Sequence, residues 1–177
     1  MRVLILVDDF YEEMEMWYPY YRLLEENIEV IIAAPGGKKE YFGKNGYPVK
    51  ADTDTTLTKS KDFQGLIIPG GYAPDKLRRY PEILQFIREM NDSGKLIASI
   101  CHGPWVLISA GIMSGRRATC FYSIKDDLVN AGALYLDEET VVDNNIITAR
   151  VPGDLPSFCR EIISFLRAMD LDHGTPH

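Results

Sequence analysis

The sequence predicts a doubly wound α/β fold, in which helices cover both faces of a mostly parallel sheet. Short apolar runs recur along the chain without polar interruption, as expected for central parallel strands that are buried on both faces. Amphipathic stretches separate these runs, and strand–helix alternation of this kind is typical of a parallel sheet. The chain has 177 residues, of which 46% are apolar and 25% charged. It is therefore long enough for one domain with a sizeable core.

The central strands are predicted by four apolar runs, "RVLILV" at 2–7, "IEVIIAA" at 28–34, "GLIIP" at 65–69 and "KLIASI" at 95–100. A helix is predicted between Pro81 and Gly94, which are typical residues for a helix start and a helix end. Its apolar face is predicted to hold Ile83, Leu84, Ile87 and Met90. The last helix has apolar residues at three- and four-residue spacing, namely Leu155, Phe158, Cys159, Ile162, Ile163, Leu166 and Met169.

Two segments break the alternation, and both predict β-hairpins. Residues 38–52 contain the dipeptide Asn45-Gly46, a typical hairpin turn. Residues 139–150 are predicted to turn around residues 143–145. Because no linker, repeat or low-complexity tract divides the chain, we expect a single domain over residues 1–170 and a frayed tail over 171–177.

Charge and cysteine content exclude several classes of function. The net charge is −7 and no lysine or arginine cluster is present, which argues against a nucleic-acid partner and a membrane surface. The first apolar run is too short for a signal peptide or a membrane span. Cys101, Cys120 and Cys159 are widely spaced and predict no disulfide framework and no metal site, so the reducing cytoplasm is the expected location. We interpret Cys120 and Cys159 as structural, and expect no cofactor.

The segment "ASICHGP" at 98–104 places a thiol where an apolar strand turns into a helix. Cys101 lies at the carboxyl end of that strand, where open α/β sheets bind their ligands. Ser99 and Gly103 flank it at the spacing of a nucleophile elbow. We therefore predict a strained backbone at Cys101 and, from the following helix N-terminus, a lowered thiol pKa. A small buried hydrophobe is the alternative interpretation.

His102 follows the thiol directly and could act as a base or, protonated, support a thiolate. Adjacent residues of a helix do not face one another, so we do not expect its ring to lie along the Cys101 side chain. A histidine that contributes only its backbone N–H is the alternative. His173 and His177 lie in the predicted tail and are not expected to contribute.

Several acidic residues follow the first strand in "VDDFYEEMEMWYP". The helix dipole alone favours acids at such a position, so most of them need no further role. Only one of Glu12, Glu13 and Glu15 can lie beside the thiol, and we select Glu15, which is inside the first helical turns. Burial would favour its protonated form, which can donate a hydrogen bond to sulfur.

Two glycines in "IIPGGYAPD" end the strand that precedes the elbow strand. Gly70 and Gly71 would let backbone N–H groups approach an oxyanion, with the N–H of His102 as a further donor. A plain turn after a strand is the alternative.

On these motifs the chain resembles the ThiJ/PfpI family, in the class I glutamine-amidotransferase-like superfamily of flavodoxin-like folds. It is most similar to the archaeal and bacterial PfpI-type intracellular proteases. The resemblance extends over nearly the whole chain, through "RVLILVDDFYEEMEMWYPYYRL", "LIIPGGYAPDKLR", "ASICHGPWVLISAG", "SIKDDLVNAG" and "ARVPGDLPSF".

The resemblance implies a role for each candidate residue. Cys101 would be the nucleophile, Glu15 the buried glutamate that touches it, and His102 the triad histidine. The N–H groups of Gly71 and His102 would form the oxyanion hole. In PfpI-type assemblies a glutamate from a neighbouring subunit completes the triad, and the matching position here is Asp75.

The resemblance also implies a homo-oligomer, from a homodimer up to a hexamer. In it, Asp75 of one chain would approach His102 of another and raise the pKa of its imidazole. The aromatic residue near the family's site corresponds to Phe121, with Tyr122 next to it, and Glu12 is a further candidate for the wall of the site.

Several activities use the same cysteine in this family, including peptidase, glutathione-independent glyoxalase and deglycase. We therefore expect a cysteine hydrolase that acts on a small carbonyl compound or a peptide through a covalent thio-adduct. The alternative is a redox-sensing or chaperone-like protein in which Cys101 is oxidised and stabilised by Glu15. A glutamine amidotransferase is excluded, because residues 144–158 lack the histidine of that class's H-x-E pair.

Overall fold

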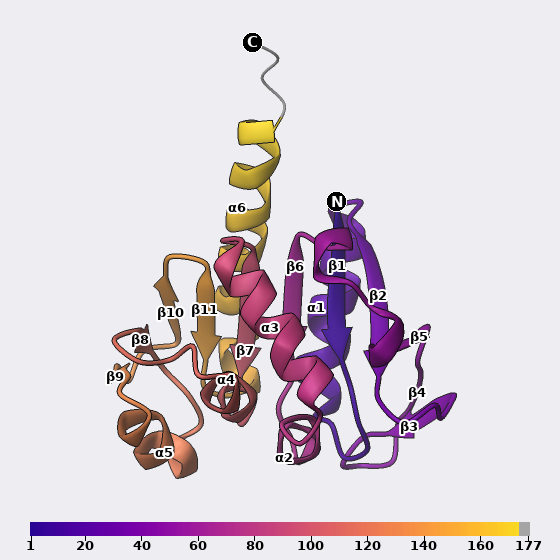
Figure 1. Cartoon of the computed structure of the whole chain (residues 1–177), viewed down its shortest axis with the longest axis horizontal. Helices are drawn as coiled ribbons and strands as arrows, with labels where there is room; N and C mark the ends of the chain where they lie inside the picture. Colours follow the sequence, from indigo (N-terminus) through magenta and orange to yellow (C-terminus); the bar gives the residue numbers. More distant parts are fainter. Residues whose placement is uncertain (174–177) are drawn as a thin grey trace.

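The computed structural model describes residues 1–173, and a seven-stranded sheet lies at its centre (Figure 1). The strand order is β10-β11-β7-β6-β1-β2-β5. All neighbouring strands are parallel except β10 and β11. The strands are β1 (Arg2–Leu6), β2 (Glu29–Ala34), β5 (Thr53–Asp54), β6 (Gly65–Ile68), β7 (Leu96–Ile100), β10 (Thr140–Asp143) and β11 (Ile146–Ala149). The predicted doubly wound, mostly parallel fold is confirmed.

Helices cover both faces of this sheet. On one face α1 (Glu13–Glu25) contacts α6 (Leu155–His173), and on the other α3 (Pro81–Asp92) contacts α4 (Pro104–Ala110). Figure 1 shows α3 in front of the strands and α1 behind them. The short helix α2 (Ala73–Leu77) packs on α4 near the carboxyl ends of the strands.

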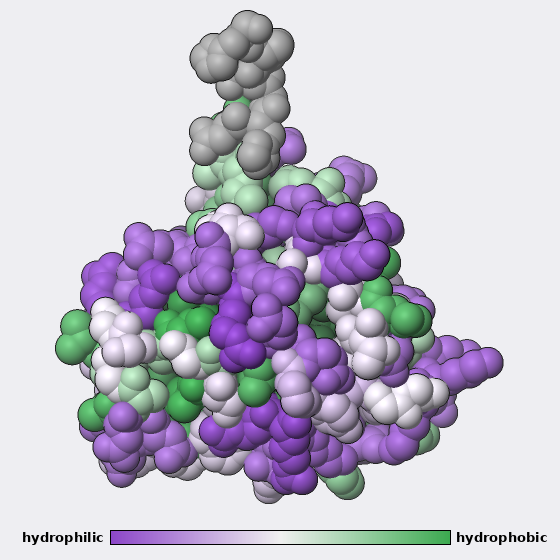
Figure 2. All heavy atoms as spheres, in the orientation of Figure 1, coloured by the Kyte–Doolittle hydropathy of each residue, from purple (hydrophilic) through white to green (hydrophobic). Residues whose placement is uncertain are grey.

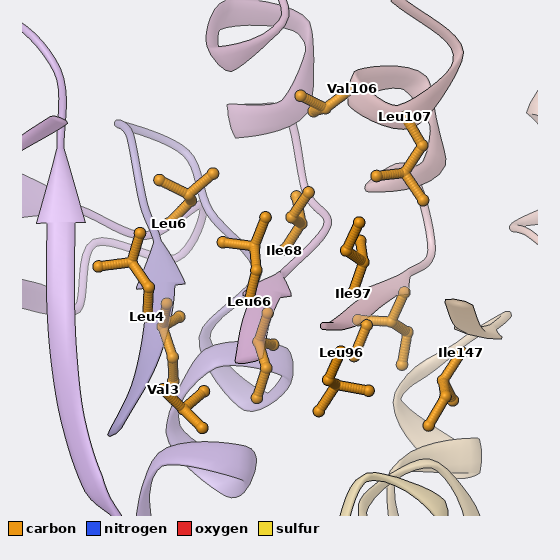
Figure 3. Packing of buried hydrophobic residues seen from close by; sticks show 14 of the residues in the cluster. Val3, Leu4, Leu6, Leu66, Ile68, Leu96, Ile97, Val106, Leu107 and Ile147 are labelled. Atoms are coloured by element: carbon orange, nitrogen blue, oxygen red, sulfur yellow. The ribbon is translucent and has the colours of Figure 1, made fainter. Parts of the chain in front are cut away.

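The four predicted central strands agree with β1, β2, β6 and β7 to within one residue at each end. Every residue of β6 and β7 is buried, because helices lie on both faces. Fully burying one such aliphatic side chain stabilises the fold by about 1.5–3 kcal/mol. Figure 3 shows this core, with labelled side chains at Val3, Leu4, Leu6, Leu66, Ile68, Leu96, Ile97, Val106, Leu107 and Ile147.

The apolar face of α3 is shifted slightly from the prediction. Ile83, Ile87 and Met90 are buried as expected, but Phe86 is buried in the place of Leu84, which is half-buried. The reason is geometric, since positions separated by three, four and seven residues share one helix face. The outer face of α3 is polar, and Figure 2 shows it as mostly hydrophilic.

Both predicted hairpins are present. The first consists of β3 (Glu40–Phe42) and β4 (Pro48–Lys50), and Gly46 in its turn has a φ of +88°. The second is β10 with β11, which turns at Asn144 and Asn145. β11 also pairs in parallel with β7, so this hairpin extends the main sheet beside the elbow strand.

The remaining elements are short. The strands β8 (Arg117–Ala118) and β9 (Leu134–Tyr135) pair in parallel, and α5 (Lys125–Asn130) lies between them in the sequence. Single turns of 3₁₀ helix are η1 (Thr55–Leu57), η2 (Ser60–Asp62), η3 (Tyr122–Ile124) and η4 (Pro152–Asp154).

The last helix is longer than expected. We predicted a frayed tail from residue 171, but α6 continues to His173. The first helix-breaking residue after Leu155 and Pro156 is Gly174, so nothing in the sequence ends the helix earlier. Residues 174–177 of the predicted tail lie outside the described residues. Among the helices of residues 1–173, none has the length and apolar character that a membrane crossing requires.

Candidate active site

A cavity of about 430 Å³ lies at the carboxyl ends of the strands, beside the end of β7. The chain adds β2 and β5 on one side of β1 and then returns to place β6 on the other. Such a reversal of strand order is the usual binding position in an open α/β sheet. The lining residues are Glu12, Glu15, Lys44, Gly71, Tyr72, Cys101, His102, Phe121, Ser123, Val151 and Pro152.

Cys101 forms the predicted strand–turn–helix corner between β7 and α4. Its φ is +62°, a left-handed conformation that non-glycine residues rarely adopt. The prediction of a strained backbone at this position is confirmed. Gly103 is required by the same corner, because a β-carbon there would lie 2.5 Å from Ser99 Oγ and 2.6 Å from the Ile68 carbonyl oxygen.

The two glycines after β6, Gly70 and Gly71, have different structural roles. A β-carbon on Gly70 would lie 2.6 Å from the β-carbon of Cys101, so only glycine allows the elbow to approach. The Gly70 N–H donates to Glu15 Oε2 at 2.7 Å. Our prediction that Gly70 supplies an oxyanion donor is therefore wrong, because its donor is already used. The N–H groups of Gly71 and His102 instead point to the Cys101 sulfur, where they favour the thiolate.

Glu15 is fully buried in the first turn of α1. Burial, and then the negative charge of Glu12, raise the pKa of its carboxyl to about 8. Glu15 is therefore protonated at neutral pH. Its Oε2 accepts from Gly70, whereas its buried Oε1 has no hydrogen-bond partner. The carboxyl lies close enough to the Cys101 thiol for each group to alter the pKa of the other. Glu13 points elsewhere, to Asn45 of the hairpin.

The Cys101 thiol has a raised pKa, about 12, and the prediction of a lowered value is wrong. Burial is the largest cause and the charge of an ionised Glu15 is the second. The N–H groups of Gly71 and His102 act in the opposite direction and are weaker. Burial of the sulfur, which residue spacing does not reveal, outweighs the helix N-terminus on which the prediction rests. A buried thiol of this kind needs a base beside it in order to react.

His102 lies beside the thiol, in the position that such a base requires. Its Nδ1 lies 3.3 Å from Cys101 Sγ, and its Nε2 lies 3.2 Å from Ser123 Oγ. Our expectation that the ring could not lie along the Cys101 side chain is wrong, because Cys101 is left-handed and α4 begins only at Pro104. Burial, and then the charge of Lys44, lower the pKa of His102. Its imidazole is therefore neutral at pH 7 and able to accept a proton.

Aromatic rings hold His102 in place. The ring of Phe121 is tilted by 31° at a centroid distance of 5.1 Å, and that of Trp105 meets His102 edge-on, also at 5.1 Å. Trp105 is itself fixed by a 2.8 Å hydrogen bond from Nε1 to Asp127. Tyr122 is 76% exposed and does not line the cavity. Its assignment to the wall of the site is corrected, because the chain turns it outward in η3.

The acidic wall of the cavity is Glu12, as we expected. Its Oε2 accepts from the Glu15 N–H at 2.8 Å and caps α1, while its Oε1 lies 3.6 Å from Lys44 Nζ. Lys44 belongs to the β3–β4 hairpin and was not singled out from the sequence. The hairpin reaches the site because its backbone bonds to Tyr11, whose carbonyl accepts the Lys44 N–H at 2.9 Å.

Asp75 lies on α2 and is not among the residues that line the cavity. Its carboxylate is half exposed and forms an ion pair with Arg79 of the same chain. Its approach to His102 of a neighbouring chain stays a prediction. Cys120 and Cys159 are buried in the core, and the pKa of each thiol is raised to about 12 by burial. Within the described residues, no three His, Cys, Asp or Glu side chains are grouped so that they could hold a metal ion.

Comparison with known proteins shows the family to which the chain belongs. The family model described as the DJ-1/PfpI family matches residues 1–165. The chain belongs to the DJ-1/PfpI family. Its family relatives include a deglycase of Pyrococcus abyssi, 44% identical over 94% of this chain and 100% of the relative. A Bacillus subtilis protein named "Putative cysteine protease YraA" is 38% identical over 94% of this chain and 98% of the relative.

Solved structures of DJ-1/PfpI proteins have the same fold. A two-domain protein of Anabaena variabilis, with DJ-1/ThiJ/PfpI-like and ferritin-like domains, matches with a TM-score of 0.91 and 43% identity. The match covers 93% of this chain and 48% of that one. DJ-1beta of Drosophila melanogaster matches with a TM-score of 0.86 and 29% identity, over 91% of this chain and 87% of the other.

Proposed function

We propose that this DJ-1/PfpI protein is a cysteine hydrolase of the deglycase or peptidase kind, in which Cys101 forms a covalent adduct with a carbonyl carbon. One observation carries the proposal: Nδ1 of a neutral His102 lies 3.3 Å from the sulfur of a strained elbow cysteine. The names of the relatives, deglycase and cysteine protease, support the same two activities. A glutathione-independent glyoxalase belongs to the same proposal.

The proposed first step is addition of sulfur to the substrate carbonyl. The S–H bond of Cys101 breaks, its proton passes to His102 Nδ1, and the S–C bond forms as the carbonyl π-electrons move to oxygen. The N–H groups of Gly71 and His102, which point to the sulfur region, would stabilise that oxygen. Protonated Glu15, beside the sulfur, would donate a hydrogen bond to the developing thiolate and so lower its energy.

The second step returns the proton. With a peptide, the imidazolium of His102 protonates the leaving nitrogen, the C–N bond breaks, and water hydrolyses the resulting thioester to an acid and the free thiol. With a dicarbonyl compound, the imidazolium protonates the alkoxide to give a hemithioacetal. His102 would then move a proton from the hemithioacetal carbon to the neighbouring carbonyl carbon, and water hydrolyses the thioester so formed to a hydroxy acid and the free thiol. General acid–base catalysis of this kind contributes typically 10²–10⁴-fold to a rate. Neutral His102 and buried, protonated Glu15 are both in the required state near pH 7.

The cavity supports a small substrate or a single side chain. Its volume of about 430 Å³ is in the range of about 300–1,000 Å³ common for small-ligand pockets. The test compares methylglyoxal, a methylglyoxal-modified amino acid and a panel of peptide–coumarin substrates. Cys101→Ala serves as the blank. Turnover of any of these that is retained by Cys101→Ala would contradict the proposal.

A second candidate function is a redox sensor. The observation that favours it is the set of donors around the sulfur, formed by Glu15 and the N–H groups of Gly71 and His102. Peroxide, as the oxidant, would convert the thiol to a sulfinate whose oxygens these donors could bind. Mass spectrometry after peroxide treatment tests it. A gain of two oxygens on Cys101, with no turnover of any carbonyl substrate, would favour the sensor over the hydrolase.

We also propose that the chain forms a homo-oligomer and works in the cytoplasm. Three free cysteines support a reducing compartment. Large exposed apolar side chains on α1 and the first hairpin support self-association, notably those of Met14, Tyr21 and Tyr47. Sedimentation velocity tests the first point, and a monomer at all concentrations would contradict it.

A further inference from the structure

The loop after β8 brings a hydroxyl to the far side of the His102 ring. The Phe121 N–H donates to the Cys101 carbonyl at 3.0 Å, and the Ile124 N–H donates to the Phe121 carbonyl at 3.0 Å. These two bonds fix η3 directly beside the elbow. They place Ser123 Oγ 3.2 Å from His102 Nε2.

The two ring nitrogens of His102 therefore have different neighbours, sulfur at Nδ1 and a hydroxyl at Nε2. A neutral imidazole carries one proton, and the nitrogen that accepts the thiol proton must be the bare one. His102 can act as a base toward Cys101 only when the proton is on Nε2. In that tautomer Nε2–H donates to Ser123 Oγ, and Nδ1 offers its lone pair to the thiol.

We propose that Ser123 is the positioning residue of this site, and that it holds His102 in the tautomer protonated on Nε2 so that Nδ1 can accept the proton of Cys101. The inference rests on the proposed function, because it assigns the partner of the base in that reaction. It differs from the prediction based on Asp75, since Ser123 belongs to the same chain as His102.

A hydroxyl beside Nε2 of His102 leaves the pKa of the imidazole lower than a carboxylate in the same place would. A carboxylate stabilises the imidazolium and raises its pKa, whereas a neutral hydroxyl does so only weakly. The charged or titratable groups that line the cavity beside the ring are Lys44 on the hairpin, Glu12 and Glu15 on the α1 side, Tyr72 after β6, and Cys101 itself. Lys44 acts against protonation of His102. His102 is thus kept neutral, as a base for neutral pH.

The experiment compares wild type with Ser123→Ala, Ser123→Thr and Tyr122→Ala. Ser123 is exposed, so its replacement leaves the core intact, and Thr restores the hydroxyl. Tyr122→Ala is the matched control, because Tyr122 precedes Ser123 in η3 and does not line the cavity. The readouts are ¹⁵N spectra of the histidine ring nitrogens, without substrate, and the kcat and KM of the substrate found above. His102→Gln assigns the His102 signals among the three histidines of the chain.

The expected spectrum of wild type shows His102 protonated on Nε2 at neutral pH. Ser123→Ala should mix the two tautomers and lower kcat by about tenfold, the size of one hydrogen bond, with KM little changed. Ser123→Thr and Tyr122→Ala should resemble wild type. An unchanged tautomer in Ser123→Ala, or a changed tautomer with unchanged kcat, would overturn the inference. Turnover retained by Cys101→Ala would instead overturn the proposed function, while the tautomer result would stand by itself.

Discussion

Two buried cysteines, Cys101 at the end of β7 and Cys159 in α6, both have a pKa raised to about 12 by burial. Their surroundings differ. Cys159 is packed on the apolar face of α6, where only the charge of Arg22 acts against burial. Cys101 has a histidine nitrogen at 3.3 Å, a protonated carboxyl beside it and two backbone N–H groups pointing at it. The comparison shows that burial and resting pKa do not distinguish a reactive thiol from a structural one, whereas the adjacent base and donors do.

Removing each thiol in turn gives the largest contrast. Cys101→Ala should lower kcat/KM by at least about 1,000-fold, because Cys101 supplies the one thiol among the described residues that line the cavity. Cys159→Ala should keep turnover within about twofold and show only a lower melting temperature, since it leaves a small void in the core. Initial rates and thermal unfolding of both variants measure this. A comparable loss of turnover in both variants would mean that Cys101 and Cys159 do not differ as reactive and structural thiols.

Removing the His102 imidazole should make the thiol of Cys101 as unreactive as that of Cys159. His102→Gln is expected to lower kcat by about 100-fold, the lower end for general base catalysis. It should also slow iodoacetamide labelling of Cys101 at pH 6.5, where we expect wild-type Cys101 to be labelled before Cys120 and Cys159. Peptide mapping by mass spectrometry gives the order of labelling. If Cys101 is labelled equally fast in His102→Gln, the imidazole does not activate the thiol.

The carboxyl beside Cys101 should make the free energy of unfolding depend on pH. The folded-state pKa of Glu15 is raised to about 8 from 4.5, so its contribution is fully present below pH 4.5 and is lost as the pH rises through about 8. We expect a loss of a few kcal/mol over this range in wild type. Glu15→Gln keeps an acceptor for the Gly70 N–H. Its free energy of unfolding should depend less on pH over the same range.

Urea unfolding at a series of pH values measures this effect. The difference between wild type and Glu15→Gln isolates Glu15, because the raised pKa of Asp8 and the lowered pKa of His102 affect both proteins alike. Parallel curves for the two proteins would mean that Glu15 is already ionised in the folded state.

The smallest expected effect concerns the neighbouring chain. Ser123 already occupies Nε2 of His102 within its own chain, so a carboxylate from another subunit can act only at longer range or through water. Asp75→Asn should therefore lower kcat by only about threefold and leave Cys101 labelling intact. Arg79→Gln is the matched control, because it breaks the same surface ion pair and keeps Asp75. If Asp75→Asn and Arg79→Gln have the same kcat, Asp75 does not contribute to the reaction at the site.

Much of the fold could be predicted from local patterns. The runs at β1, β2, β6 and β7, the Asn45-Gly46 turn and the Ser99–Cys101–Gly103 spacing depend on residues that are near in sequence. A strand buried on both faces requires apolar residues, and a tight strand–turn–helix corner requires small ones. Both requirements can be recognised in the sequence. The same spacing identified Cys101, and the position of Glu15 at the start of α1 followed from the helix after the first strand.

The tertiary structure decided how the site functions, because the deciding contacts join distant parts of the chain. Glu15 accepts the N–H of Gly70, 55 residues away, and so removes the oxyanion donor that the sequence predicts at Gly70. Ser123 meets His102 across 21 residues through a loop that has no regular pattern. The thiol pKa depends on the burial of the sulfur, which local spacing does not encode. A sequence specifies which groups are present near a strand end, whereas only packing determines which of their donors, acceptors and charges remain free.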